Sequence, residues 1–181
     1  MSKKRRNILL AFIIPALLFY VVFWISPVLM SFYYGLTNWR GMGDFDIVGM
    51  KNYANLIKQG TLFNSMGNTI KYTLFVVIWG NIQALALAMI LNMKLKARGV
   101  FRTIFYIPAL FSTIVVAFLW SYVYAPHYGM ISEIFNLFGS SNAPNLLGSK
   151  ATSLFAAAFV ETWKTSGTMT IIYLAGLQNI S

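Results

Sequence analysis

The sequence predicts an all-α integral membrane protein that crosses a bilayer with about four transmembrane helices. Of its 181 residues, 58% are hydrophobic and only 10% are charged, which leaves more apolar surface than one soluble domain can cover. Four stretches are long and apolar enough to cross a hydrocarbon layer of roughly 30 Å as helices that rise about 1.5 Å per residue. Lys and Arg outnumber Asp and Glu by 14 to 4, and many of them cluster at the ends of apolar runs, where they orient a membrane protein.

The first predicted span runs from about Ile8 to Tyr33 and follows a basic amino terminus. This apolar run is about twice as long as the core of a signal peptide and has no small-residue cleavage site, so we expect an uncleaved helix. Residues 1–37 therefore form the amino terminus and the first transmembrane helix. Residues 38–69 form an outer loop with a short amphipathic helix near Asn52 to Gln59.

Three further spans are predicted in residues 70–181, at about Ile70 to Asn92, Ile104 to Tyr124 and Ser153 to Leu174. The loop between the second and third spans has four positive charges and no acid: Lys94, Lys96, Arg98 and Arg102. Short basic loops stay in the cytoplasm, so this loop and both ends of the chain are expected to be cytoplasmic.

The second span carries a repeat of small residues, Gly80, Ala84 and Ala88, with Asn81 beside it. Small residues every four positions let another helix approach closely. Two interpretations stay open for Asn81, which either faces a transport path or bonds to a neighbouring helix.

The fourth span is the least apolar, because it contains Glu161 and Lys164 as well as Thr165 and Thr168. A charge at mid-membrane costs about 2.5 to 3.5 kcal/mol, so such residues normally face a protein interior or a watery cavity. Their three-residue spacing predicts that Glu161 and Lys164 pair on one helix face. The alternative is a purely structural ion pair.

Catalytic chemistry has little support in the sequence. The chain has no Cys and a single His, His127, and no catalytic or phosphate-binding motif is present, so no catalytic residue and no metal site are expected. A membrane-embedded lipid-modifying enzyme and a polytopic scaffold remain as alternative classes, but the four acidic residues are scattered and the scaffold class gives no reason for the polar fourth span.

Three stretches, taken in order, resemble one family. They are VGMKNYANL at residues 48–56 with Asn68 and Thr69 after it, LNMKLKARGVFRTIFYIP at 91–108, and YLAGLQNI at 173–180. As a set they resemble the membrane permease subunits of binding-protein-dependent ABC importers, in the maltose-type branch that takes up sugars.

The resemblance implies a six-helix permease that forms part of the translocation path for a sugar in a bacterial inner membrane. It implies a heterodimer with a second permease subunit, a cytoplasmic ATPase dimer that holds ATP and Mg, and an extracytoplasmic solute-binding protein. No cofactor on this chain and no nucleic acid are expected. The resemblance implies that residues 70–181 are the first part of the permease core. This part is expected to be truncated before the family's Glu-Ala-Ala coupling loop, since the chain stops at Ser181.

Within this resemblance we expect two sets of functional residues. The candidate path residues are Asn81, Glu161, Trp163, Lys164, Thr165 and Thr168, where the Trp163 ring could stack on a sugar. The residues that lead into the ATPase-coupling loop are Leu177, Gln178, Asn179 and Ile180.

Overall fold

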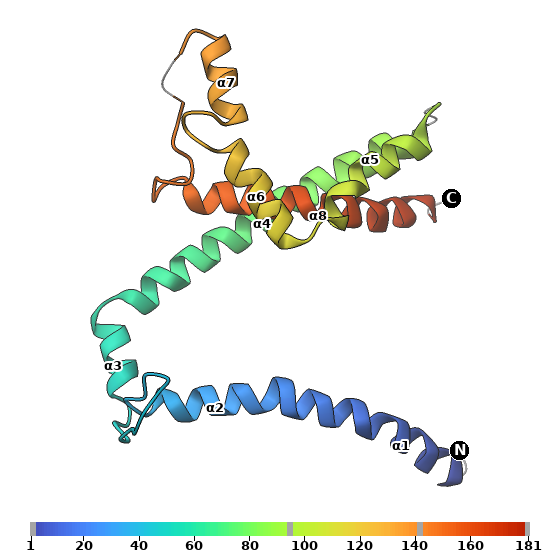
Figure 1. The fold of residues 1–181 in the computed structure, drawn as a ribbon. Coiled ribbons are helices and arrows are strands. Elements are labelled where there is room, and N and C mark those ends of the chain that lie inside the picture. The colour runs from blue at the N-terminus through green and yellow to red at the C-terminus, as the bar shows by residue number, and fades with distance from the viewer. Residues whose placement is uncertain (1–2, 94–95, 141–142, 180–181) are drawn as a thin grey trace. The chain divides into compact units, whose positions relative to one another are not determined.

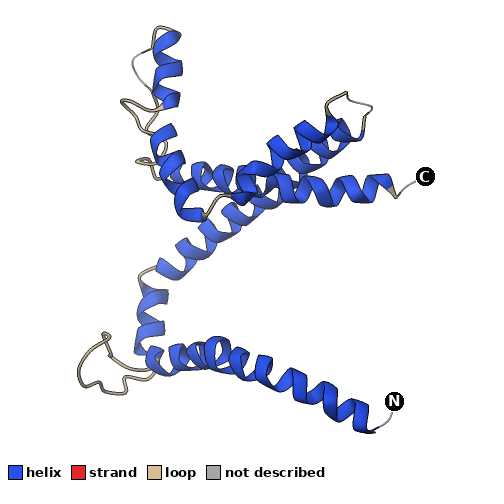
Figure 2. Ribbon diagram, turned by 45° about the vertical axis from the view of Figure 1, so that its right-hand side comes forward, coloured by secondary structure: helices blue, strands red, loops and turns tan. Residues whose placement is uncertain are grey.

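The structure is a computed structural model that describes residues 3–93, 96–140 and 143–179. Within these ranges the chain is helical apart from turns, loops and one isolated antiparallel bridge between Thr37 and Ile47 (Figure 2). The predicted all-α class is confirmed. The chain divides into two compact units, residues 1–65 and residues 66–181.

The first unit begins with one long helical stretch made of α1 (Lys3–Tyr20), the π-helix η1 (Val21–Ile25) and α2 (Ser26–Gly35). In η1 the Ser26 N–H donates to the carbonyl of Val21, five residues earlier. Pro27 follows directly; it has no N–H to donate and its ring crowds the preceding turn, so the helix widens there. Residues 11–35 are long and apolar enough to cross a membrane, which agrees with the first predicted span.

A short helix, α3 (Lys51–Lys58), is held against the end of α2. Its Asn52 side chain donates from Nδ2 to the carbonyls of Gly35 and Thr37, at 2.9 and 2.7 Å. The last carbonyls of a helix have no partner within that helix, so Asn52 satisfies the Gly35 carbonyl at the end of α2 and also the Thr37 carbonyl just beyond it. The predicted short amphipathic helix is therefore present, and this part of the 48–56 stretch has a structural role.

In the second unit, α4 (Thr61–Asn92) contacts α8 (Ser153–Gln178) through small side chains. The buried residues of α4 are Gly80, Ala84, Ala88 and Leu91. A Cβ at position 80 would lie 3.5 Å from the Thr162 side chain of α8, and Leu174 of α8 joins Ala88 and Leu91 in a core cluster. The small-residue repeat is thus a helix-packing face, as predicted.

The helix α5 (Arg98–Leu110) lies beside the second half of α8 (Figure 1). The two backbones touch at Gly167, where an added Cβ would lie 2.7 Å from the Cα of Tyr106. Real Cβ atoms do not approach backbone atoms so closely, so only glycine fits at this position. Gly167 therefore sets the distance between α5 and α8.

The third predicted span, from Ile104 to Tyr124, is wrong as a single straight helix. The chain instead forms α5 and α6 (Thr113–Val123), which are bent by 99° relative to each other. Pro108 removes a backbone donor near the end of α5, and Phe111 and Ser112 are extended. Ser112 then begins α6 as its N-cap, because its Oγ accepts from the Val115 N–H at 3.3 Å.

After α6, the chain forms the short helix α7 (Met130–Leu137) before it reaches α8. The end of α6 is fixed to α8, because the buried Tyr124 hydroxyl donates to the Ala156 carbonyl at 3.3 Å. In the part of the chain that the structure describes, two helices are long and apolar enough to cross a membrane, or three if α5 and α6 make one span. The fourth predicted span, α8, has 26 residues but is not among these helices.

Candidate functional site

Helix α8 has two faces of opposite character. Its buried face repeats every four residues: Ala158, Thr162, Ser166, Thr170 and Leu174. We use the name polar stripe for Glu161, Lys164, Thr165 and Thr168, whose spacing of three, four and seven residues places them on one face. At 3.6 residues per turn, the centres of the two faces lie about 150° apart around the helix. None of the four polar-stripe residues is buried in this chain.

Lys164 in the polar stripe bonds to another helix. Its Nζ donates to Thr113 Oγ1 at 2.7 Å, directly after the bend between α5 and α6. Glu161 and Lys164 both lie in the described ranges, and no ion pair joins them. The predicted Glu161–Lys164 pair is therefore wrong: a shared face allows the pair, but the long lysine side chain also reaches α6 and finds a hydroxyl there.

The other members of the polar stripe differ in their hydrogen bonds and in their exposure. The Thr165 hydroxyl donates to the backbone carbonyl of Glu161 at 2.8 Å, a common use of threonine within a helix. The Glu161 side chain is partly exposed. Thr168 is exposed. Within the stripe, Thr168 is thus exposed, whereas the carboxylate of Glu161 and the ammonium group of Lys164 belong to partly exposed side chains.

Trp163 lies on a different side of α8 from the polar stripe. Its ring meets the ring of Trp120 on α6 edge-on, with centroids 5.3 Å apart. It also lines a cavity of about 490 Å³ between α4, α5 and α8, together with Gln83 and Ser166. Gln83 Oε1 is buried with no hydrogen-bond partner in the described structure, and Gln83 is not among the residues expected from the sequence. The sequence signal that points to Gln83 is its position as a second polar side chain in an apolar helix, two residues after Asn81.

Asn81 joins α4 to α8 and lies apart from the polar stripe. Its Oδ1 accepts a hydrogen bond from the hydroxyl of Tyr173, and its Nδ2 donates to the carbonyl of Val77 on its own helix. Of the two open interpretations, this contact matches a bond to a neighbouring helix. The structure therefore brings four of the six candidate path residues onto one face and places Asn81 and Trp163 elsewhere.

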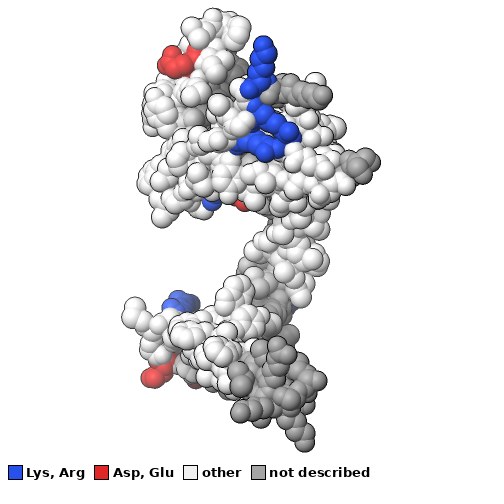
Figure 3. Space-filling model, turned by 90° about the vertical axis from the view of Figure 1, so that its right-hand side faces the viewer, with Lys and Arg blue, Asp and Glu red and all other residues white. Residues whose placement is uncertain are grey.

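The carboxyl-terminal end of α8 lies beside the start of α5. With its amide oxygen turned toward them, Gln178 accepts hydrogen bonds from the guanidinium groups of Arg98 and Arg102, at 3.0 Å from Arg102 Nη2. Leu177 packs on the core cluster, Asn179 follows the last turn of α8, and Ile180 lies outside the described residues. Basic side chains gather in a patch on one face of the molecule (Figure 3).

Two curated relatives match this chain over most of its length. The trehalose/maltose transport system permease protein MalF of Thermococcus litoralis is 34% identical over 169 residues, which cover 93% of this chain and 57% of the relative. The multiple sugar-binding transport system permease protein MsmF of Streptococcus mutans is 31% identical over 170 residues, covering 93% of this chain and 58% of the relative. The chain thus spans less than two thirds of these relatives. No protein-family model matches it.

The relatives that match this chain are sugar ABC transporter permeases. The fold agrees, because a chain in the crystal structure of a bacterial alginate ABC transporter, in complex with an alginate pentasaccharide-bound periplasmic protein, superposes on this chain with a TM-score of 0.79. That solved chain is 21% identical, and the match covers 98% of the present chain and 60% of the solved one. The likeness in fold therefore extends over both units.

Proposed function

We propose that this chain is part of the transmembrane permease subunit of an ATP-driven, binding-protein-dependent importer for a sugar or related solute, and that the polar stripe of α8 lines its translocation path. The observation that carries the proposal is the stripe itself. Glu161 and Thr168 lie on the face of α8 opposite its packing face, where Glu161 is partly exposed and Thr168 is exposed. A charged face of a membrane helix is costly against lipid, so it is expected to meet a protein or watery interior.

The partners follow from the same arrangement. In the proposed assembly, a second permease subunit contributes to the path, and a solute-binding protein outside the membrane delivers the solute. The relatives' names and the alginate transporter support this assembly, since that structure contains a periplasmic protein loaded with a saccharide. A separate cytoplasmic ATPase dimer would bind ATP and Mg and drive the change between inward-open and outward-open states.

The proposed topology has four crossings, with both ends of the chain in the cytoplasm of a bacterial cell whose inner membrane holds the protein. The bent pair of α5 and α6 counts as one crossing and α8 as the last. Gln178 lies beside Arg98 and Arg102, so the start of α5 and the end of α8 are on the same side of the unit. Basic residues of short loops remain cytoplasmic, which supports that side for both.

Cysteine labelling tests the path. The 181 residues contain no Cys, so each single substitution introduces one new thiol into them. In the assembled transporter, Thr168→Cys should react with a membrane-impermeant maleimide, because a watery path lets the thiol ionise. Ile78→Cys is the control: Ile78 is an exposed apolar residue of α4, and a thiol in hydrocarbon should stay unreactive.

The outcome separates two positions for the stripe. Labelling of Thr168→Cys that slows when the transported sugar is added would support a path position. If Thr168→Cys is as unreactive as Ile78→Cys, the stripe is packed against protein or lipid and the proposed path is wrong.

A further inference from the structure

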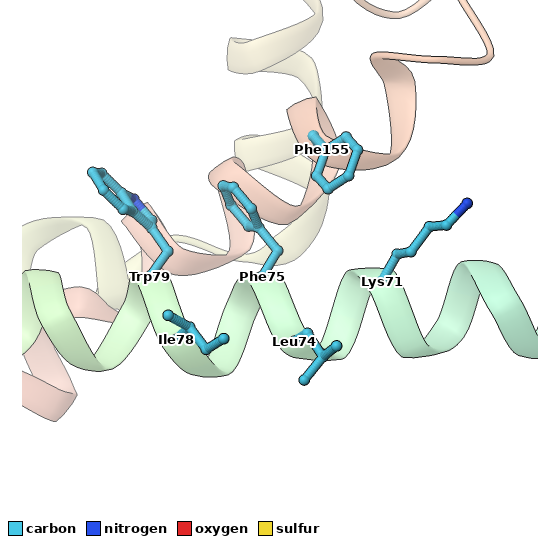
Figure 4. Close-up of a pocket in the computed structure, with 6 residues that line it drawn as sticks. All are labelled: Lys71, Leu74, Phe75, Ile78, Trp79 and Phe155. Carbon is cyan, nitrogen blue, oxygen red and sulfur yellow. The ribbon is translucent and has the colours of Figure 1, made fainter.

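A groove of about 400 Å³ runs along α4 beside the start of α8. One lysine and five apolar side chains line it: Lys71, Leu74, Phe75, Ile78, Trp79 and Phe155. Figure 4 shows Lys71, Phe75 and Trp79 projecting from the same side of α4, on which Phe155 of α8 also lies. The Phe75 ring meets the Phe155 ring edge-on, with centroids 5.6 Å apart, and stacks with Trp79 at 6.4 Å. The groove therefore has an aromatic wall and a single cation.

The position of Lys71 along α4 matches the surface of a membrane. Asn92, at the end of α4, adjoins the basic loop, and Lys71 lies 21 residues before it. At about 1.5 Å per residue this separation is about 31 Å, close to the thickness of the hydrocarbon layer. Lys71 is thus at headgroup depth, and the groove extends from it toward Trp79 for about 12 Å, inside one leaflet of roughly 15 Å.

The groove floor is open in this chain. Leu74 and Ile78 are 53% and 56% exposed, and Trp79 is 43% exposed. Apart from Lys71, no charged side chain lines the groove, so its occupant must be apolar along its length and anionic or polar at one end. A phospholipid has this distribution: an acyl chain fits the apolar part and a headgroup phosphate meets the ammonium group.

We propose that this groove is a binding site for an anionic phospholipid, with one acyl chain against Leu74, Ile78 and Trp79 and the headgroup at Lys71. The lysine makes the site selective, because a net negative headgroup is attracted to the ammonium group whereas a zwitterionic headgroup is not. One basic residue near a membrane surface favours an anionic lipid by about fivefold.

Fluorescence of Trp79 provides a local test. The purified 181-residue chain is reconstituted in phosphatidylcholine vesicles that contain an equal mole fraction of either phosphatidylglycerol or phosphatidylcholine with brominated acyl chains. The Trp79 signal is the difference between each protein and the same protein carrying Trp79→Phe, which removes the contribution of the other four tryptophans. We expect brominated phosphatidylglycerol to quench Trp79 about fivefold more effectively.

Two variants show whether Lys71 is responsible. Lys71→Gln should make the two brominated lipids equally effective, while Lys96→Gln, the same change at an exposed lysine outside the groove, should keep the preference. Equal quenching by both lipids in the unaltered protein would reduce the groove to unselective lipid contact and overturn the proposal. Absence of quenching by either lipid would also overturn it, because protein would then cover the groove.

Discussion

Lys164 on α8 donates a hydrogen bond of 2.7 Å to Thr113 Oγ1, the first residue of α6. Thr113 directly follows the extended residues Phe111 and Ser112, where α5 and α6 diverge by 99°. The bond therefore ties the polar stripe of α8 to the bend. A change at the bend should therefore alter the position of Lys164, and a change at Lys164 should alter the bend.

The first prediction concerns this bond. Lys164→Met and Thr113→Val should each lower the thermal stability of the detergent-solubilised protein, because a hydrogen bond that involves a charged group contributes about 1.5 to 3 kcal/mol and partial exposure reduces that value. The double variant should lose no more than the worse single variant. Thr168→Val, at an exposed threonine of the same stripe, serves as the control. Additive losses from Lys164→Met and Thr113→Val would show that the bond contributes nothing.

The second prediction concerns Glu161, which does not pair with Lys164 in the described structure. Glu161→Gln combined with Lys164→Met should change stability by the sum of the two single effects, within about 0.5 kcal/mol, because the two charges do not share a bond. The measurement is a double-mutant cycle on unfolding. A coupling above about 1 kcal/mol would restore the ion pair that the spacing predicts.

The third prediction concerns the contact between α5 and α8. Gly167→Ala should destabilise the protein by about 1 to 3 kcal/mol, because the added methyl group meets the backbone of Phe105 and Tyr106 and the helices must separate. Gly176→Ala in the same helix is the matched control, since an added Cβ there meets nothing within 4 Å. Removing a helical glycine at such an open position should be neutral or slightly stabilising. Equal stability of the two variants would mean that α5 and α8 are not in close contact at Gly167.

The fourth prediction concerns topology. A reporter enzyme that works only in the cytoplasm should be active when fused near Lys96 or after Ser181 and inactive when fused near Gly60 or Asn142, because the basic loop at 94–102 stays inside. A reporter active only outside should give the opposite pattern at the same four positions. Activity of the cytoplasmic reporter at Gly60 would contradict the proposed first crossing.

Local patterns predict much of this protein. The all-α class, the first two long apolar helices and the short helix α3 follow from runs of hydrophobic residues and their periodicity, which depend on neighbours along the chain. The packing face at Gly80, Ala84 and Ala88 follows for the same reason. The polar stripe is also predictable as a set, because residues three and four apart share a helix face.

The bend and the partner of Lys164 were decided by tertiary structure. A long apolar run from Ile104 to Tyr124 satisfies the length of a span, and the weaker local signals at Pro108 and Ser112 did not show which way the chain would turn. Spacing predicts Lys164 beside Glu161, yet its flexible side chain bonds to Thr113, 51 residues earlier in the chain. Sequence determines which residues share a helix face; which other helix meets that face depends on packing distances such as the one that Gly167 permits.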